Sequence, residues 1–255
     1  LTIEKAHAAL IAGEYSAVEL AQAYLDVIAE KNADINAYVE VYTDVLEQAQ
    51  IADSMFKNGS ATMLTGIPIS VKDNMCVKGK ESTGASDILK GHISIYDGTV
   101  IAELKKAGAV LLGRTNMDDA AMGSSTETSC YGKTLNPLAL DRVPGGSSGG
   151  PAASVAMGGA LVAFASDTGG SIRQPAAYTG LIGLKPTYGT VSRYGLMALT
   201  SSFDQIGPLT KNVADAEILF NMTNTYDSMD SMSVPVEKRV CTKTTVKKIG
   251  IPTSW

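Results

Sequence analysis

Residues 149–175 decide the fold class, because they join a helix of small residues to an apolar strand and a glycine-rich turn. They begin with Gly149-Gly-Pro-Ala-Ala-Ser-Val-Ala-Met157, which predicts a helix, and continue with Leu161-Val-Ala-Phe164, which predicts a strand. The stretch closes with Ser166-Asp-Thr-Gly-Gly-Ser171-Ile-Arg-Gln-Pro175. A helix followed directly by an apolar strand is typical of an α/β sheet.

The same alternation extends upstream of this stretch. Ile67-Pro-Ile-Ser-Val71 and Ala109-Val-Leu-Leu112 predict strands, and residues 97–107 between them predict a helix that ends at Gly108. Residues 123–150 hold no periodic pattern and are rich in Gly, Ser, Thr, Asn and Pro. A loop that long inside a compact domain is usually functional, or else it contains an element that the pattern does not reveal.

The first sixty residues predict helices. Ser16-Ala-Val-Glu19 is a capping box, in which the serine and the glutamate satisfy backbone N–H groups where a helix starts. Apolar residues then recur at helical spacing to about Lys31, and a second helix is predicted from about Thr43 to Phe56.

Composition excludes several classes of protein. A net charge of −5 over 255 residues lacks the basic footprint that nucleic-acid binding needs. Three widely spaced cysteines form neither a disulfide framework nor a metal pattern, which predicts a cytoplasmic protein and no metal site. No apolar run is long enough for a membrane span, and the start lacks the apolar run of a signal peptide. Residues 248–251 predict a strand just before the end, so we expect a fragment of a longer protein.

A lysine at a strand end is the first candidate for chemistry. Lys72 follows the apolar strand 67–71 in Gly66-Ile-Pro-Ile-Ser-Val-Lys72-Asp-Asn. Burial there would disfavour the ammonium form and lower the pKa, as a lysine base requires. Asp73 need not pair with it, since consecutive strand side chains point to opposite faces. The alternative is a surface lysine.

Two glycine-rich segments supply candidate serines. Pro144-Gly-Gly-Ser147-Ser-Gly-Gly150 can take backbone angles closed to other residues, or it is a flexible linker. Successive N–H groups of Thr168, Gly169, Gly170 and Ser171 could form an anion-binding concavity for the oxyanion of an acyl intermediate, with the serine as nucleophile. The alternative is a tight turn between a strand and a helix.

A competing motif makes Ser148 the nucleophile. Residues 146–150 match GxSxG, the nucleophile elbow of α/β-hydrolases, which requires a histidine downstream. The only histidines, His7 and His92, lie upstream, so this interpretation fails. A Cys130–His92 pair has no supporting motif. A lysine base is the natural substitute for histidine.

Taken together, the three segments resemble the amidase signature family. The resemblance implies a catalytic Ser–cisSer–Lys triad on Ser171, Ser147 and Lys72, with the oxyanion held by the N–H groups at residues 168–171. It also implies a mixed central sheet covered by helices on both faces, incomplete at the C-terminus. Residues 1–255 would form the N-terminal portion of that domain, with 1–60 helical, 61–223 the catalytic core and 224–245 an irregular connection.

Within the family, the long loop resembles one branch most closely. Asn116-Met-Asp-Asp-Ala-Ala-Met-Gly-Ser-Ser-Thr-Glu-Thr-Ser129 and Arg142-Val-Pro-Gly-Gly look like the A subunits of tRNA-dependent amidotransferases. This likeness implies that glutamine is the substrate and that its ammonia passes to partner subunits B and C, which amidate Glu-tRNA(Gln). It implies no cofactor in this chain, with ATP and Mg²⁺ at the partner subunit. The alternatives are a stand-alone amidase on small or aryl amides and an inactive fragment.

Overall fold

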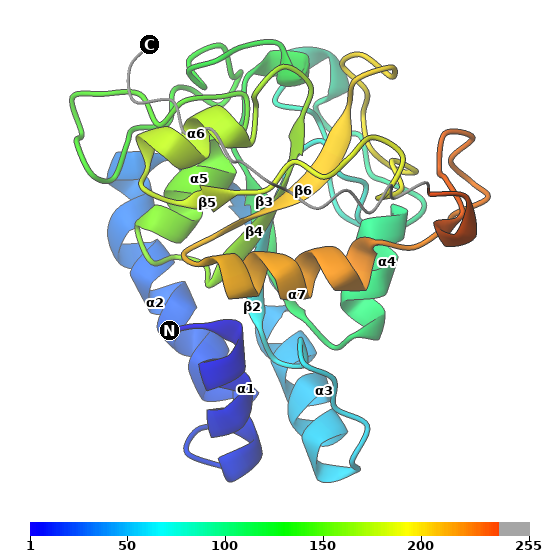
Figure 1. Cartoon of the computed structure of the whole chain (residues 1–255). Helices are drawn as coiled ribbons and strands as arrows, with labels where there is room; N and C mark the ends of the chain where they lie inside the picture. The colour runs from blue at the N-terminus through cyan, green and yellow to red at the C-terminus, as the bar shows by residue number, and fades with distance from the viewer. Residues whose placement is uncertain (240–255) are drawn as a thin grey trace, which may run out of the picture.

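The computed structural model describes residues 1–239 of the chain. They fold around one mixed β-sheet with helices packed around it (Figure 1). Its six strands follow in the order β1-β3-β2-β4-β6-β5. The bounds are β1 Tyr38–Val41, β2 Pro68–Lys72, β3 Val110–Thr115, β4 Val162–Asp167, β5 Ile182–Gly183 and β6 Gln205–Thr210.

The sheet is parallel at its centre and antiparallel towards its edges. β2 pairs in parallel with β3 on one side and with β4 on the other. β1 runs antiparallel to β3, and β6 runs antiparallel to β4 and β5. Every residue of β2, β3, β4 and β6 is buried. Because successive strand side chains point to opposite faces, both faces of the sheet are covered, and the predicted fold class is confirmed.

The helices of the described residues cover this sheet (Figure 1). Helix α5 packs on β4 and β2, helix α7 packs on β6, and α2 and α3 pack on each other and on β3. The α-helices are α1 Ile3–Ala12, α2 Ala17–Ile35, α3 Val45–Lys57, α4 Thr99–Lys106, α5 Gly149–Ala156, α6 Arg173–Tyr178 and α7 Val213–Thr223. The 3-10 helices are η1 Asp87–Leu89, η2 Asp119–Ala121 and η3 Val236–Lys238. None of these helices is long and apolar enough to cross a membrane.

The N-terminal capping box is present as predicted. The Ser16 hydroxyl accepts from the Glu19 N–H at 3.1 Å, and the Glu19 carboxylate accepts from the Ser16 N–H at 2.8 Å. The reciprocal pair satisfies two N–H groups that the first turn of α2 leaves free. Helix α2 continues beyond the predicted end near Lys31 and stops at Ile35, where Asn36 takes the left-handed conformation.

The sequence predicted that region 1–60 is helical throughout. This prediction is wrong, because the region contains the edge strand β1. This strand pairs with β3 at Val41↔Gly113. A Cβ at Gly113 would overlap the main-chain oxygen of Glu40, so the glycine permits the close approach of the two strands. Four residues are too few for a clear alternating pattern, which explains why the sequence did not reveal this strand.

The C-terminal predictions are tested only in part. Residues 224–239 are irregular apart from η3, which agrees with the predicted connection as far as the described residues extend. The strand predicted at residues 248–251 lies outside the described residues.

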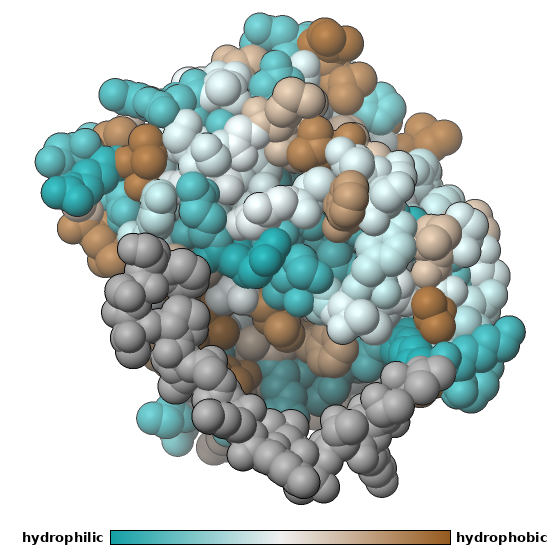
Figure 2. Space-filling view, turned by 45° about the horizontal axis from the view of Figure 1, so that its top comes forward, coloured by the Kyte–Doolittle hydropathy of each residue, from teal (hydrophilic) through white to brown (hydrophobic). Residues whose placement is uncertain are grey.

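On the face in Figure 2, exposed apolar residues lie in separate groups among polar ones.

Candidate active site

The fold brings the predicted segments together at the carboxyl ends of the central strands of the sheet. β2 and β4 are neighbouring parallel strands, paired through Val71↔Phe164. Their carboxyl ends therefore lie side by side, with Lys72 ending β2 and the turn 168–171 directly following β4. Helix α5 packs on both strands, so the loop 144–148 that precedes it reaches the same edge. Ligand sites of open α/β sheets form at such edges.

Lys72 is fully buried at the end of β2, with 0 % exposure of the residue. Its Nζ lies 2.8 Å from Ser147 Oγ and 3.0 Å from Ser166 Oγ. Burial lowers the pKa of Lys72 from 10.5 to about 7, against an opposite effect of the Asp118, Asp167 and Asp204 charges. The side chain is therefore a buried amine in contact with two hydroxyls, which agrees with the predicted burial and excludes a surface lysine.

Ser147 and its neighbour Ser148 differ in what their side chains contact. The peptide bond Gly146–Ser147 is cis. Ser147 Oγ faces Lys72, whereas Ser148 Oγ donates to the main-chain oxygen of Ser166 at 3.0 Å. The Ser148 N–H donates to the main-chain oxygen of Ser171 at 3.2 Å. Ser148 thus holds two loops together and does not face the lysine, which agrees with the rejection of the GxSxG interpretation.

The turn that carries Ser171 is organised by Asp167. One carboxylate oxygen accepts from the Gly170 N–H at 2.9 Å, and the other accepts from the Ile172 N–H at 2.9 Å. The Arg173 guanidinium donates to both oxygens, at 2.9 and 3.1 Å. Burial alone would raise the pKa of Asp167, but the hydrogen bonds from Arg173 and Ile172 lower it. The carboxylate therefore stays charged and fixes the turn.

This arrangement limits which N–H groups can hold an oxyanion. The sequence led us to expect that the N–H groups of all four residues from 168 to 171 could bind the oxyanion. The Gly170 N–H cannot, because it donates to the Asp167 carboxylate. The N–H groups of Gly169 and Ser171 have no hydrogen-bond partner among residues 1–239. The Thr168 N–H is equally without a partner among these residues, and the Thr168 side chain donates to Asp204 at 2.6 Å. Of the four predicted donors, Thr168, Gly169 and Ser171 therefore keep a free N–H among the described residues, and Gly170 does not.

A cavity of about 380 Å³ opens over Ser171. Ser171 is 7 % exposed, while Lys72 and Ser147 lie fully buried beneath it. No hydrogen bond joins Ser171 Oγ to Ser147 in the described part of the chain. The remaining lining residues come from the long loop, the Gly146 segment and the turn: Ala121, Met122, Gly123, Ser124, Gly146, Thr168, Gly169, Gly170, Gln174 and Leu199.

Sequence reasoning missed Ser166, which is the second hydroxyl on Lys72. Its Oγ also accepts from Asn74 Nδ2 at 2.9 Å. The pairing Val71↔Phe164 places Lys72 and Ser166 at the matching ends of adjacent strands. A sequence signal existed, since both residues follow apolar strands, but strand order and register were needed to use it.

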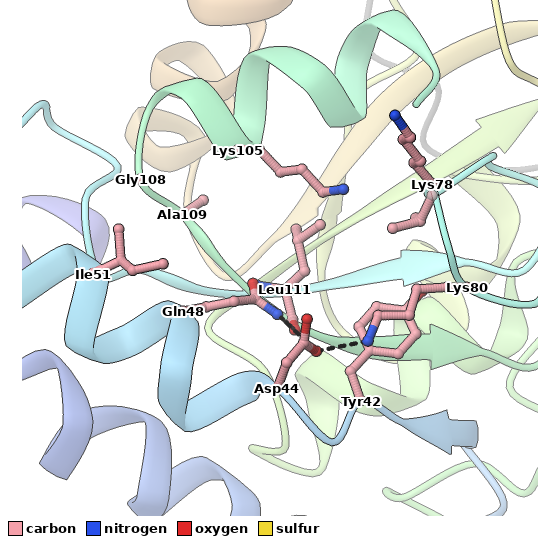
Figure 3. Close-up of a pocket in the computed structure, with 11 residues that line it drawn as sticks. Tyr42, Asp44, Gln48, Ile51, Lys78, Lys80, Lys105, Gly108, Ala109 and Leu111 are labelled. Atoms are coloured by element: carbon pink, nitrogen blue, oxygen red, sulfur yellow. Dashed lines mark hydrogen bonds and ion pairs between the residues drawn. The ribbon is translucent and has the colours of Figure 1, made fainter. Parts of the chain in front are cut away.

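A second cavity, of about 260 Å³, shares no residue with the first (Figure 3). Tyr42, Asp44 and Gln48 line it together with Lys78, Lys80 and Lys105. Lys80 donates to Asp44 at 2.8 Å, and Lys105 donates to Asp97 at 2.7 Å. None of the predicted catalytic residues lies here.

The other predicted assignments concern histidines, cysteines and metals. His7 lies in α1 and His92 in an exposed loop, and neither side chain has a hydrogen bond to Lys72, Ser147 or Ser171 in the part of the chain that the structure describes. Cys76 and Cys130 are free thiols. Residues 1–239 contain no cluster of metal-ligating side chains. The absence of a cofactor in this chain stays a prediction.

Comparison with known proteins identifies the family. The sequence profile described as "Amidase" matches residues 19–254. This chain belongs to the amidase family. The chain is 50% identical over 239 residues to the A subunit of glutamyl-tRNA(Gln) amidotransferase from Caldanaerobacter subterraneus subsp. tengcongensis, covering 93% of the chain and 49% of the relative. It is 52% identical to the corresponding protein of Desulfatibacillum aliphaticivorans, with 93% and 49% covered.

Solved structures of amidase-family proteins share the fold. The A subunit of glutamyl-tRNA(Gln) amidotransferase from Thermotoga maritima has 42% identity and a TM-score of 0.80, covering 92% of this amidase-family chain and 49% of its own. Peptide amidase from Stenotrophomonas maltophilia has 34% identity and a TM-score of 0.87, covering 91% and 49%. The chain thus spans about half the length of the relatives it matches.

Proposed function

We propose that this chain carries the amide-hydrolysing site of a glutamine-dependent amidotransferase. The observation that supports it most directly is the buried Lys72 amine, 2.8 Å from the Ser147 hydroxyl, beneath a cavity that Ser171 lines. A lysine whose pKa lies at about 7 is partly neutral at physiological pH, so its nitrogen can accept a proton. We propose that Ser147 carries that proton.

The proposed reaction begins with acylation of Ser171. Its hydroxyl attacks the amide carbonyl and transfers its proton to Ser147 Oγ, while the Ser147 proton passes to Lys72 Nζ. The free N–H groups among Thr168, Gly169 and Ser171 stabilise the oxyanion. As the carbon–nitrogen bond breaks, Lys72 returns the proton through Ser147 to the departing amine. Water then attacks the acyl-enzyme by the same proton route and releases the acid.

Glutamine is the proposed substrate, and the released ammonia is proposed to serve a partner. Support comes from the names of the relatives at 50% and 52% identity, both A subunits of glutamyl-tRNA(Gln) amidotransferases. We propose that subunits B and C use the ammonia to convert Glu-tRNA(Gln) to Gln-tRNA(Gln), with ATP and Mg²⁺ bound at the partner subunit. The net charge of −5 agrees with tRNA being held by the partner.

A stand-alone amidase acting on small or aryl amides is the second candidate. The Stenotrophomonas peptide amidase favours it, because its TM-score of 0.87 exceeds the 0.80 of the Thermotoga protein. The two candidates use the same site and differ in whether partners are needed.

Ammonia release by the complete protein separates the candidates. The test measures release from glutamine with and without subunits B and C, charged tRNA and ATP. We expect release to rise when they are added. An enzyme indifferent to them supports the stand-alone amidase. Ser171→Ala abolishes acyl-enzyme formation in either case, and an acyl-enzyme that persists in this variant contradicts the assignment of the nucleophile.

A further inference from the structure

Asp118 is a buried carboxylate beside the loop 144–148. The proposed reaction assigns no role to this carboxylate. It is fully buried immediately before η2. Its N–H donates to the main-chain oxygen of Ser147 at 3.2 Å, and one carboxylate oxygen accepts from Thr128 Oγ1 at 3.0 Å. The other oxygen, Oδ2, has no hydrogen-bond partner among the described residues. An unpartnered buried carboxylate oxygen is costly, so its retention requires an explanation.

The chain around Asp118 has room for this carboxylate because two glycines lie against it. A Cβ at Gly146 would overlap Asp118 Oδ2, and a Cβ at Gly123 would overlap the Asp118 carboxyl group. Gly146 is also the first residue of the cis peptide to Ser147. The carboxylate therefore lies directly against the peptide that carries the proton relay.

Three carboxylates act on Lys72, and they differ in how far their charge is compensated. Asp167 is paired with Arg173 and accepts main-chain N–H groups. Asp204 accepts from Thr168 Oγ1 and from the N–H groups of residues 199 and 200. Asp118 accepts one hydroxyl only. Among the charges that raise the pKa of Lys72 it has the largest effect, second only to the opposing effect of burial.

We propose that Asp118 is a positioning residue that sets the pH range in which Lys72 can act as a base. Its main-chain N–H holds the Ser147 peptide, and its unpartnered charge favours the protonated amine. The inference rests on the proposed function, because it concerns the proton route from Ser171 through Ser147 to Lys72. It assigns the carboxylate a role in tuning this route without contact with the substrate.

The direction of the effect follows from the sign of the charge. A nearby anion stabilises the ammonium form, so Lys72 keeps its proton to a higher pH than burial alone would allow. Removing the anion makes Lys72 lose its proton at a lower pH. The acid limb of the pH–activity profile, where activity rises with deprotonation of the base, then moves to lower pH.

The test compares Asp118→Asn with Asp119→Asn in the complete protein with its partners. The first change removes the charge and retains an oxygen for Thr128 and the main-chain bond to Ser147. The second removes a neighbouring charge that is not among the three carboxylates that raise the pKa of Lys72. We expect the acid limb of kcat/KM for glutamine to move down by roughly one pH unit in Asp118→Asn, about a tenfold higher value on that limb. The Asp119→Asn profile coincides with that of the wild type.

Asp118→Ser provides a second uncharged variant in case the amide does not fold, and heat melts monitor both. A limb that does not move in a folded Asp118→Asn or Asp118→Ser protein, or that moves to higher pH, contradicts the inference. So does failure of both variants to fold, since Asp118 would then serve the fold alone. If the wild type releases no ammonia, or its limb is independent of Lys72, the proposed function fails instead.

Discussion

Lys72 and Lys80 are both held by hydrogen bonds to oxygen, yet their surroundings differ in one decisive respect. Lys72 is fully buried and contacts the hydroxyls of Ser147 and Ser166. Lys80 is partly exposed, donates to the Asp44 carboxylate at 2.8 Å and lies 4.9 Å from the centre of the Tyr42 ring. A carboxylate in contact stabilises an ammonium, whereas burial among hydroxyls does not. The same residue type is therefore a buried amine with a lowered pKa at one site and an ion-pair partner at the other.

The largest expected effect is loss of activity in Lys72→Met. The variant has no group to take the proton from Ser147, so amide hydrolysis falls by roughly 10²–10⁴-fold. Lys80→Met is the matched control, and its activity stays within about twofold of the wild type. Steady-state ammonia release measures both. Similar losses of activity in the two variants would contradict the proposal that Lys72, and not Lys80, takes part in catalysis.

The second effect concerns stability and depends on pH. Unfolded Lys72 binds its proton up to 10.5, whereas the native residue, with a pKa of about 7, releases it. Between these values the unfolded state binds more protons, so this residue's contribution to stability rises with pH from about 7 to 10.5, and it is lost as the pH falls from 10.5 to about 7. As the pH rises across this window, the free energy of unfolding of Lys72→Met relative to wild type therefore decreases by on the order of 5 kcal/mol.

Heat melts over a pH series measure this difference. Lys80→Met again serves as the control, because an exposed pair adds little pH-dependent stability. A constant difference between wild type and Lys72→Met at all pH values contradicts a neutral buried amine.

The third effect separates two adjacent serines. Ser147→Ala interrupts the proton route and lowers activity by roughly 10²–10³-fold, whereas Ser148→Ala removes a hydrogen bond to a main-chain oxygen and lowers it far less, by under about tenfold. Acylation rates of the two purified variants provide the measurement. If Ser148→Ala proves the more damaging change, the roles of the two serines are reversed.

The smallest effect is expected at the ion pair in the second cavity. Asp44→Asn removes the charge facing Lys80 and lowers the free energy of unfolding by about 0–1 kcal/mol, as is usual for partly exposed pairs. Urea unfolding measures it at low and high salt, and the difference shrinks at high salt. A loss of several kcal/mol at either salt concentration would contradict its treatment as an exposed pair.

Local signals in the sequence predicted much of the fold and part of the site. The capping box at Ser16 and the apolar strand before Lys72 are short-range patterns, and the structure has both. Edge strand β1 was missed because four residues carry little periodicity. The assignment of Lys72, Ser147 and Ser171 came from a family resemblance, since no spacing rule joins residues that far apart in the chain.

The supporting residues could not be predicted because their roles depend on tertiary contacts. Asp118, Asp167 and Ser166 lie in segments that only the strand order β3-β2-β4 brings beside Lys72. The commitment of the Gly170 N–H to Asp167 depends on how the turn closes. From the sequence alone, Gly146 suggests a flexible backbone. In the structure, the glycine instead leaves room for the Asp118 carboxylate, which a Cβ at this position would overlap.

The proposed mechanism requires that neutral Lys72 activates Ser171 through Ser147. The most direct measurement is the pH dependence of Ser171 acylation by glutamine, detected by mass spectrometry after rapid acid quenching of the complete protein with its partners. The Ser–Ser–Lys mechanism predicts that the wild-type rate rises with pH to a plateau, with a midpoint at about 7, and that Lys72→Met shows neither the rise nor the plateau. Acylation of Ser171 in Lys72→Met at the wild-type rate would contradict it.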